Sequence, residues 1–339
     1  MNQAEPLPTF LPDPWIEPYS AKSTAPGTPV GNIGITQDLS ELGLPATFAL
    51  GFVTTSGAFA DYRHVPESNG TNAGLTVFSL PVALGVDLTE RLSVGASMAL
   101  GIAFFDGPFV GIGGMTPDYA LRGTVGANYR LTDRTTLGVY YQTKQSLTFD
   151  NAILLFNDNV RRDIDMDLPQ NIGFGLANNT LLDGRLLIGV DVLYKLWNDT
   201  DLFGAVYDNQ WVVQVGAQYS AGRYRLRAGY AWAENPIDST PDFNVGGINL
   251  GELPLVAYTQ GLLAITCQHR ISAGFGIVDV LPGIDLDFMA GGMFRDTQQL
   301  GQFTTTSLAS YWLGAGLTWR FGRGSCKDLP VPDRWSCEW

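Results

Sequence analysis

Basic side chains that could bind an anion recur at alternate positions of extended segments. Lys144, Lys195, Arg225 and Arg227 each lie opposite a row of apolar neighbours. A cation there can form a strong, charge-assisted hydrogen bond with a carboxylate. The same face also carries acids and amides, so pairing within the set would explain most of its members. The full set is Arg122, Arg130, Lys144, Asp191, Lys195, Gln214, Gln218, Arg225, Arg227, Asp285 and Asp287.

A second group of residues is apolar and lies in the connections between these segments. Its members are Phe105, Phe109, Ile112, Leu154, Leu155 and Phe156. Apolar connections favour either loops packed into a lid or a landing site for a hydrophobic ligand. On the second reading, these residues are candidates for substrate capture.

The sequence gives little support for catalysis. Two histidines, His64 and His269, have no cysteine or acid at zinc-ligand spacing, and no nucleophile elbow or phosphate loop is present. We therefore expect no enzyme, no cofactor and no metal. The net charge of −13 argues against a nucleic-acid partner, which requires a basic surface.

The elements that position these residues are β-strands. Apolar residues alternate in Leu186–Leu196 and again in Tyr311–Phe321, which ends on an aromatic residue. This alternation is typical of a transmembrane antiparallel β-barrel with lipid outside and a polar lumen inside. We predict twelve strands, with fourteen allowed, over 46–62, 74–88, 91–105, 119–131, 134–148, 169–180, 185–197, 209–220, 223–232, 266–279, 283–294 and 307–321.

The connections between the predicted strands alternate in length. Tight turns such as 132–134 and 282–283 separate the long segments 63–73, 106–118, 149–168, 198–208, 233–265 and 295–306. Outer-membrane barrels have this asymmetry, and an even strand count would leave both termini on the periplasmic side. No run of 18 apolar residues suggests a transmembrane helix.

Three regions follow from these patterns. Residues 1–45 contain eight prolines and are predicted to be a leader or a plug in the lumen, 46–321 the barrel, and 322–339 a periplasmic tail. Cys326 and Cys337 in the tail could pair or stay free. The chain starts without an export signal, so either the protein is cytosolic or the numbering begins after such a signal; the barrel pattern favours the second.

Pro81 interrupts an otherwise regular predicted strand, 74–88. Proline removes a backbone donor from the ladder, so it marks a bulge or a local break. A break beside the following strand, which contains Gly95 and Gly101, could open the wall sideways. A tolerated bulge near the rim is the alternative.

Several segments resemble the outer-membrane long-chain fatty acid and aromatic-hydrocarbon transporters of the FadL/TodX type. The resemblance covers roughly residues 74–295 and rests on Asp167–Ala177, Gly189–Val192, Val215–Tyr219 and Leu226–Tyr230 followed by Asn235-Pro236-Ile237. It implies a monomeric barrel, usually of fourteen strands, that captures hydrophobic substrate with its outer loops and releases it laterally beside a kinked strand. This chain departs from the family in its strand count, its Pro-rich start and its 18-residue tail.

The sequence therefore favours passive uptake of fatty acids or hydrocarbons across a Gram-negative outer membrane. Expected partners are the hydrophobic substrate, outer-membrane lipids and lipopolysaccharide, and the barrel-assembly machinery, for which Gly316, Trp319 and Phe321 resemble a signal. A water-filled porin for polar or anionic solutes is the alternative. A structural or adhesin-like barrel is a third reading, for which the sequence offers no positive sign.

Overall fold

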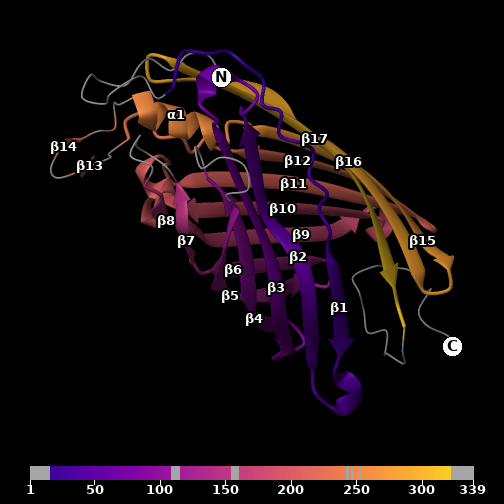
Figure 1. Ribbon diagram of the computed structural model, residues 1–339. Helices are drawn as coiled ribbons and strands as arrows, with labels where there is room; N and C mark the ends of the chain where they lie inside the picture. The colour runs from indigo at the N-terminus through magenta and orange to yellow at the C-terminus, as the bar shows by residue number, and fades with distance from the viewer. Residues whose placement is uncertain are drawn as a thin grey trace.

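Alternating apolar residues form long strands that pair with their neighbours in chain order. The computed structural model describes residues 16–107, 115–153, 160–241, 244–245, 248–249, 251 and 254–321. Thirteen strands form one antiparallel sheet (Figure 1). They are β1 (Ile33–Asp38), β2 (Ala46–Asp61), β3 (Asn72–Asp87), β4 (Leu92–Asp106), β5 (Met115–Thr132), β6 (Thr135–Gln142), β9 (Gln170–Leu181), β10 (Leu186–Leu196), β11 (Gln210–Ala221), β12 (Tyr224–Ala233), β15 (His269–Leu281), β16 (Ile284–Leu300) and β17 (Thr304–Trp319).

Smaller elements lie in the connections. Strands β7 (Gln145–Ile153) and β8 (Arg162–Leu168) form one hairpin, and β13 (Asn244–Val245) and β14 (Ile248–Asn249) form another. The helix α1 spans Pro254–Leu262, and single helical turns are η1 (Ser40–Leu42), η2 (Pro66–Ser68), η3 (Leu182–Gly184), η4 (Trp197–Asp199) and η5 (Phe203–Ala205). Within the part of the chain that the structure describes, no helix has the length and apolar character needed to cross a membrane.

All twelve predicted strands are present in the sheet, and the thirteenth is β1. This strand was not predicted because only Ile33 and Ile35 alternate in a segment dominated by proline and glycine. It pairs with the N-terminal half of β2, from Ile33 opposite Phe52 to Asp38 opposite Thr47. Residues 16–32 run along the C-terminal half of β2, where Thr24 N donates to Asp61 O at 2.9 Å.

Because the sheet has thirteen strands, an odd number, the described chain begins at the opposite end of the sheet from the one predicted. Ile16 is buried with Tyr19, Tyr62 and Tyr258 at the end of the sheet that carries the long connections, whereas the even count predicted both termini at the short-turn end. Residues 1–15 and 322–339, and with them Cys326 and Cys337, lie outside the described residues. The order of the described strands runs from β1 at one edge to β17 at the other.

Two predicted boundaries are wrong. The predicted strand 134–148 is two strands, because β6 ends at Gln142 and the alternation of Leu147 and Phe149 belongs to β7 in the loop hairpin. The predicted long connection 295–306 is only 301–303, since β16 and β17 continue to pair as far as Leu300 and Thr304.

The register gives the sheet an apolar outer face. Val139 of β6 pairs with Phe174 of β9, which pairs with Val192 of β10, and the row continues through Val213 to Trp232. Many side chains on this face are exposed in the isolated chain, including Phe174 at 57 % and Leu313 at 81 %. Such a belt is suited to lipid.

Candidate functional site

The inner face of the sheet is lined by glycines. Gly85 pairs with Gly95, Gly95 with Gly126, and Gly138 with Gly175. Because successive side chains of a strand point to opposite faces, all of these positions lie on the face opposite the apolar belt. Glycine weakens a strand, so its repeated use here favours a role in keeping the interior open.

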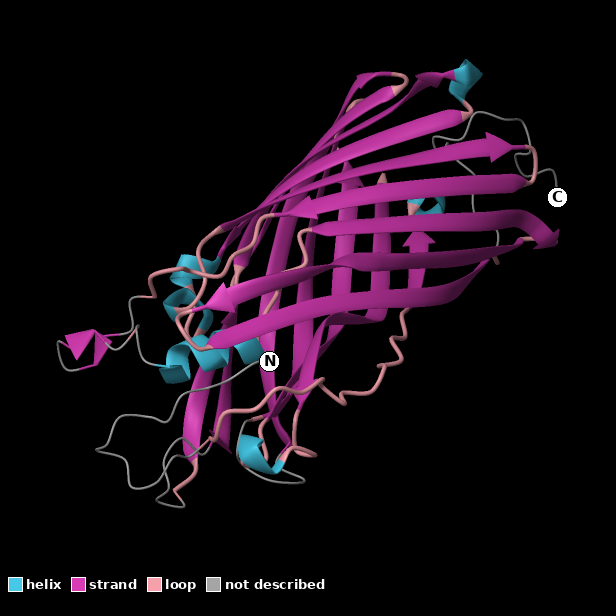
Figure 2. Cartoon of the chain, turned by 90° about the horizontal axis from the view of Figure 1, so that it is seen from above, coloured by secondary structure: helices cyan, strands magenta, loops and turns pink. Residues whose placement is uncertain are grey.

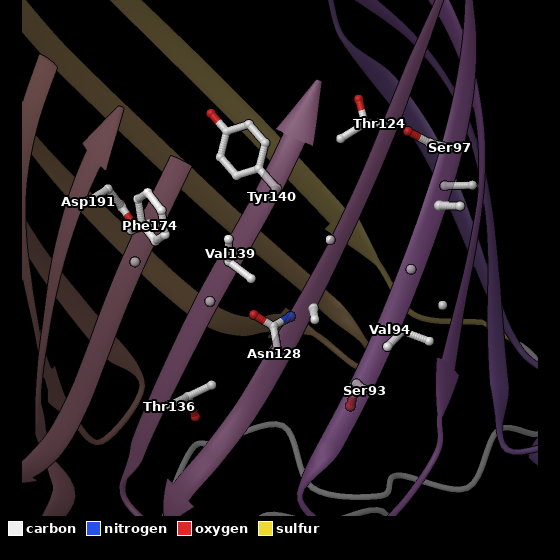
Figure 3. Close-up of a pocket in the computed structure, with 18 of the residues that line it drawn as sticks. Ser93, Val94, Ser97, Thr124, Asn128, Thr136, Val139, Tyr140, Phe174 and Asp191 are labelled. Carbon is white, nitrogen blue, oxygen red and sulfur yellow. The ribbon is translucent and has the colours of Figure 1, made fainter. Parts of the chain in front are cut away.

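A cavity of about 820 Å³ lies against this glycine-rich wall. Its lining comes from strands β2 to β6 and β9 to β11 and includes Gly85, Gly95, Gly126, Gly138, Gly175 and Gly189. Figure 3 shows Ser93, Asn128 and Thr136 toward one end of the cavity, and Ser97, Thr124 and Tyr140 toward the other. The volume is in the range that small-molecule ligands occupy.

The larger inward side chains lie across glycines of neighbouring strands. A methyl group at Gly173 would overlap the ring of Tyr140, and one at Gly291 would overlap the indole of Trp312. Asp191 covers Gly175 in the same way. These glycines allow bulky groups to lie flat on the wall instead of projecting across the lumen.

An apolar lid, a name we use for hairpin β7–β8, residues 197–207 and residues 254–265, packs at the long-loop end of the sheet. Its buried residues pack against the start of β3 and the end of β4, which lie at the long-loop end of the sheet. Phe105 of β4 contacts Phe149 of β7 with ring centroids 5.2 Å apart, and Trp197 contacts Phe203 at the same distance. In Figure 1, β7, β8 and α1 lie at one end of the sheet, and Figure 2 shows most helical turns at the end away from the C-terminus.

Polar contacts tie the lid to the sheet and join its parts. Gln145, which is buried, donates through Nε2 to Ala120 O of β5 at 3.0 Å. Gln260 of α1 donates to Val206 O at 3.2 Å, and the Tyr207 hydroxyl donates to Leu263 O. A buried polar group that is left unpaired costs stability, so these contacts fix the arrangement of the lid.

Phe105 lies near the end of β4, where it is buried against Phe149 of the lid. The other predicted capture residues, Phe109, Ile112, Leu154, Leu155 and Phe156, lie outside the described residues. Their role stays a prediction.

Three of the four predicted anion-binding cations already have carboxylate partners. Arg227 pairs with Asp287, and Arg225 lies 3.7 Å from Asp285. Lys144 is 2.7 Å from Asp167 in the lid. Acids of β16 lie beside Arg225 and Arg227, and an acid of β8 lies beside Lys144, so these three cations are paired within the protein, and their binding of a substrate carboxylate stays a prediction.

Lys195 differs from these three residues. It lies on the inner face of β10 opposite Asn171 and Gln210, and none of the ion pairs among the described residues includes it. Its ammonium lies 6.0 Å from the centroid of the Trp197 ring in the lid. The sequence prediction for Lys195 thus remains compatible with the structure.

Pro81 breaks the ladder on one side only. Strand β3 pairs continuously with β4, and Pro81 lies opposite Ala99. On the other side, pairing with β2 stops at Leu50–Val82 and resumes at Val53–Ser79. The break therefore lies beside the preceding strand and not, as predicted, beside the following one, because the missing N–H of proline is on the β2 side.

A second cavity, of about 290 Å³, adjoins this break. It is lined by β1, β2 and β3 and includes Gly34, Gly51 and Pro81. Among the described residues, no group of three or more histidine, cysteine or acidic side chains could hold a metal ion. The two cavities and the lid are thus the features from which a function can be argued.

Comparison with solved structures identifies the fold. The chain superposes on the Pseudomonas putida toluene transporter TodX with a TM-score of 0.62 and 16 % identity, over 91 % of this chain and 84 % of TodX. The chain has the TodX fold. The antiparallel β-barrel class predicted from the sequence is therefore confirmed, as is the structural resemblance to FadL/TodX-type proteins.

Two further structures share this fold. A FadL homologue from Pseudomonas aeruginosa gives a TM-score of 0.59 at 16 % identity, over 86 % of this chain and 77 % of that one. The Ralstonia pickettii toluene transporter TbuX gives 0.55 at 15 % identity, over 81 % and 78 %. No protein-family model matches the sequence, and neither does any curated protein.

Proposed function

We propose that this chain is an outer-membrane barrel through which hydrophobic small molecules cross passively. The observation that carries the proposal is the apolar lid above a glycine-lined cavity. A lid of this kind would exclude water while offering an apolar path, whereas a diffusion porin has an aqueous channel. The solved structures with this fold include proteins described as toluene transporters and a FadL homologue.

The proposed path has three parts. Phe105 and the apolar connections capture the substrate, the cavity takes it in, and the break beside Pro81 releases it sideways. The second cavity supports this exit because its lining includes Pro81, at the break, and residues of β1, the strand at one edge of the sheet. On this path the substrate crosses the membrane without being chemically changed.

Uptake of radiolabelled toluene and oleate tests the proposal. A strain that lacks its own transporters for these compounds should take them up faster when it expresses this chain. Unchanged uptake of both compounds would refute the proposal.

Conductance in planar bilayers separates the proposal from the porin alternative. A lidded barrel should conduct little, while a water-filled porin should conduct steadily. Steady conductance together with unchanged uptake of hydrophobic compounds would favour the porin.

A further inference from the structure

We propose that the two edge strands of the sheet, β1 and β17, form a lateral gate to the membrane, and that the helix α1 is the clasp that holds this gate at the long-loop end. The inference deepens the proposed function, on which it rests, by naming where an apolar molecule passes from the barrel into lipid.

The first step is the open edge of the sheet at β17. The order of strands runs from β1 to β17, and no pairing joins these two strands in the described part of the chain. Tyr311 and Leu313, on the outer face of β17, are 86 % and 81 % exposed, whereas Phe288 on the same face of the neighbouring β16 is 49 % exposed. The difference indicates that β17 lacks a neighbour on one side.

The second step concerns the backbone groups along this edge. Arg320 N donates at 2.8 Å to Gly283 O, in the turn before β16. Since antiparallel partners hydrogen-bond at alternate residues, the odd-numbered residues from Tyr311 to Trp319 direct their N–H and C=O groups away from β16. Backbone groups without partners are costly in lipid, so this edge must be covered when the protein lies in a membrane.

The third step is the assignment of β1 as the strand that covers this edge. β1 is the other edge strand of the sheet, and joining the two edges closes the wall. The two strands occupy the first and thirteenth places of an antiparallel order, so both run toward the short-turn end and would pair in parallel, which is slightly less stable per residue. β1 has six residues, whereas the shortest ladders between β2 and β17, those of β6 with β5 and β9, have eight residue pairs. A ladder between β1 and β17 would therefore be the weakest line of the wall and the first to open.

The fourth step is the helix α1, which contacts both sides of this line. On the β1 side, the buried hydroxyl of Tyr258 donates to Thr71 Oγ1 at 2.8 Å and lies 2.7 Å from the hydroxyl of Tyr19, in the segment that leads into β1. On the β17 side, Thr306 Oγ1 donates to Gly261 O of the helix at 3.4 Å. Because α1 joins the two edges at the long-loop end, a gate held there would open toward the short-turn end.

The fifth step is the route that this gate offers. The lining of the second cavity combines Pro81 and Val53, beside the break in the β2–β3 ladder, with Ile33 and Ile35 of β1. Apolar surface thus extends from the break to the edge strand. A molecule in this cavity would reach lipid by passing the edge of β1, and the β2–β3 ladder would not have to separate.

Cross-linking across the gate tests the proposal. Ile35→Cys and Leu317→Cys place one thiol on the outer face of each edge strand, in a full-length chain whose own cysteines are replaced by serine. In outer membranes, a reducible bis-thiosulfonate reagent should join these thiols within one chain and lower toluene uptake severalfold, and reduction should restore the uptake. Ile35→Cys with Leu50→Cys is the matched control, because these residues face each other across β1 and β2, and its cross-link should leave uptake unchanged.

Three results would overturn the gate. The first is failure of the thiols at positions 35 and 317 to cross-link. The second is a cross-link that joins two chains, which would assign the edge of β17 to a second copy of the protein. The third is unchanged toluene uptake after cross-linking within one chain.

Tyr258→Phe tests the clasp. Loss of this hydroxyl removes the hydrogen bonds with Thr71 and Tyr19, so the edges should separate more often and the cross-link across the gate should form severalfold more slowly. Tyr62→Phe is the control, since it removes a hydroxyl from the same buried cluster that takes no part in these hydrogen bonds. Equal cross-linking rates with and without Tyr258→Phe, in chains that keep the heat-resistant electrophoretic mobility of a folded barrel, would overturn the clasp.

Uptake distinguishes this inference from the function on which it rests. If the cross-link across the gate forms as expected but the chain takes up neither toluene nor oleate, the proposed function fails and the gate stands. If toluene uptake is present and insensitive to the cross-link, the gate fails and the transport function stands.

Discussion

Lys144 Nζ lies 2.7 Å from Asp167 Oδ2, and this ion pair connects three parts of the long-loop end. Lys144 follows β6, Asp167 belongs to β8, and the same Asp167 oxygen accepts from Asp201 N at 3.0 Å in the loop after β10. Lys144 also donates to Asp199 O at 3.2 Å. The pair thus joins the hairpin and the η4–η5 loop into one lid.

Substitution of Lys144 by methionine should loosen this lid. Asp167 is 1 % exposed and would keep a buried charge without its cation. The expected loss is about 1–2 kcal/mol of lid stability at pH 7, toward the low end because exposed ion pairs are screened and Lys144 is 38 % exposed. Amide exchange at Leu147 and Phe149 measures it. Lys144→Arg is the control, and equal protection in Lys144→Met would contradict the role of the pair.

The same pair gives the lid a pH dependence. Burial alone would raise the pKa of the Asp167 carboxyl, but hydrogen bonds from Lys144 and Asp201 N hold that pKa below its usual range. The stabilisation is therefore present above the ordinary aspartate pKa of about 3.9 and is lost as pH falls through the lower folded value. Protection of Leu147 should decrease on acidification in the wild type and much less in Lys144→Met.

Substitution of Gly189 by leucine should block the cavity without disturbing the wall. A methyl group at Gly189 would meet no atom within 4 Å, and Gly189 lines the large cavity. The leucine side chain would therefore occupy the lumen, and uptake of toluene should fall severalfold while the barrel stays folded. Val190→Leu, one residue along on the outer face, is the control. Normal uptake in Gly189→Leu would exclude this cavity from the path.

The outer face of the barrel could be predicted from sequence because every strand exposes alternate side chains to lipid, which favours apolar residues at those positions. Leu313, Leu317 and Trp319 are exposed where the alternation of Tyr311–Phe321 placed them. Strand β1 escaped prediction because six residues with two isoleucines carry too little of the pattern. Pairing with the N-terminal half of β2 holds this strand in place instead.

The inner face was harder to predict because it depends on register. Arg227 and Asp287 pair across a separation of 60 residues, and nothing local to either residue shows this. The glycines at alternate positions, such as Gly173 and Gly175, were a usable signal for a spacious lumen.

Replacement of Pro81 by alanine tests the lateral exit. Alanine would restore the N–H that the β2–β3 ladder lacks between Val53–Ser79 and Leu50–Val82. If substrate leaves here, a closed ladder should slow uptake of toluene while raising barrel stability. Pro117→Ala is the matched control, because Pro117 also lies inside a strand but near the lid, opposite Phe104. Faster unfolding or unchanged uptake in Pro81→Ala would remove the exit from this position.

Replacement of Asp208 by asparagine should strengthen the lid at neutral pH and have no effect in acid. Burial, together with the nearby carboxylates of Asp238 and Glu234, raises the pKa of Asp208. The folded state therefore holds this proton more tightly than the unfolded chain, and lid stability falls as pH rises from about 3.9 to the raised value. Above that window the charge repels its neighbours, and asparagine removes the repulsion. Amide protection of the adjacent Tyr207, whose N–H donates to Phe203 O at 2.7 Å, should rise at pH 7 and match the wild type at pH 3. Glu67→Gln makes the same charge change in another connection and should leave Tyr207 unaffected, so an equal gain in that control would assign the effect to net charge instead of to the Asp208 group.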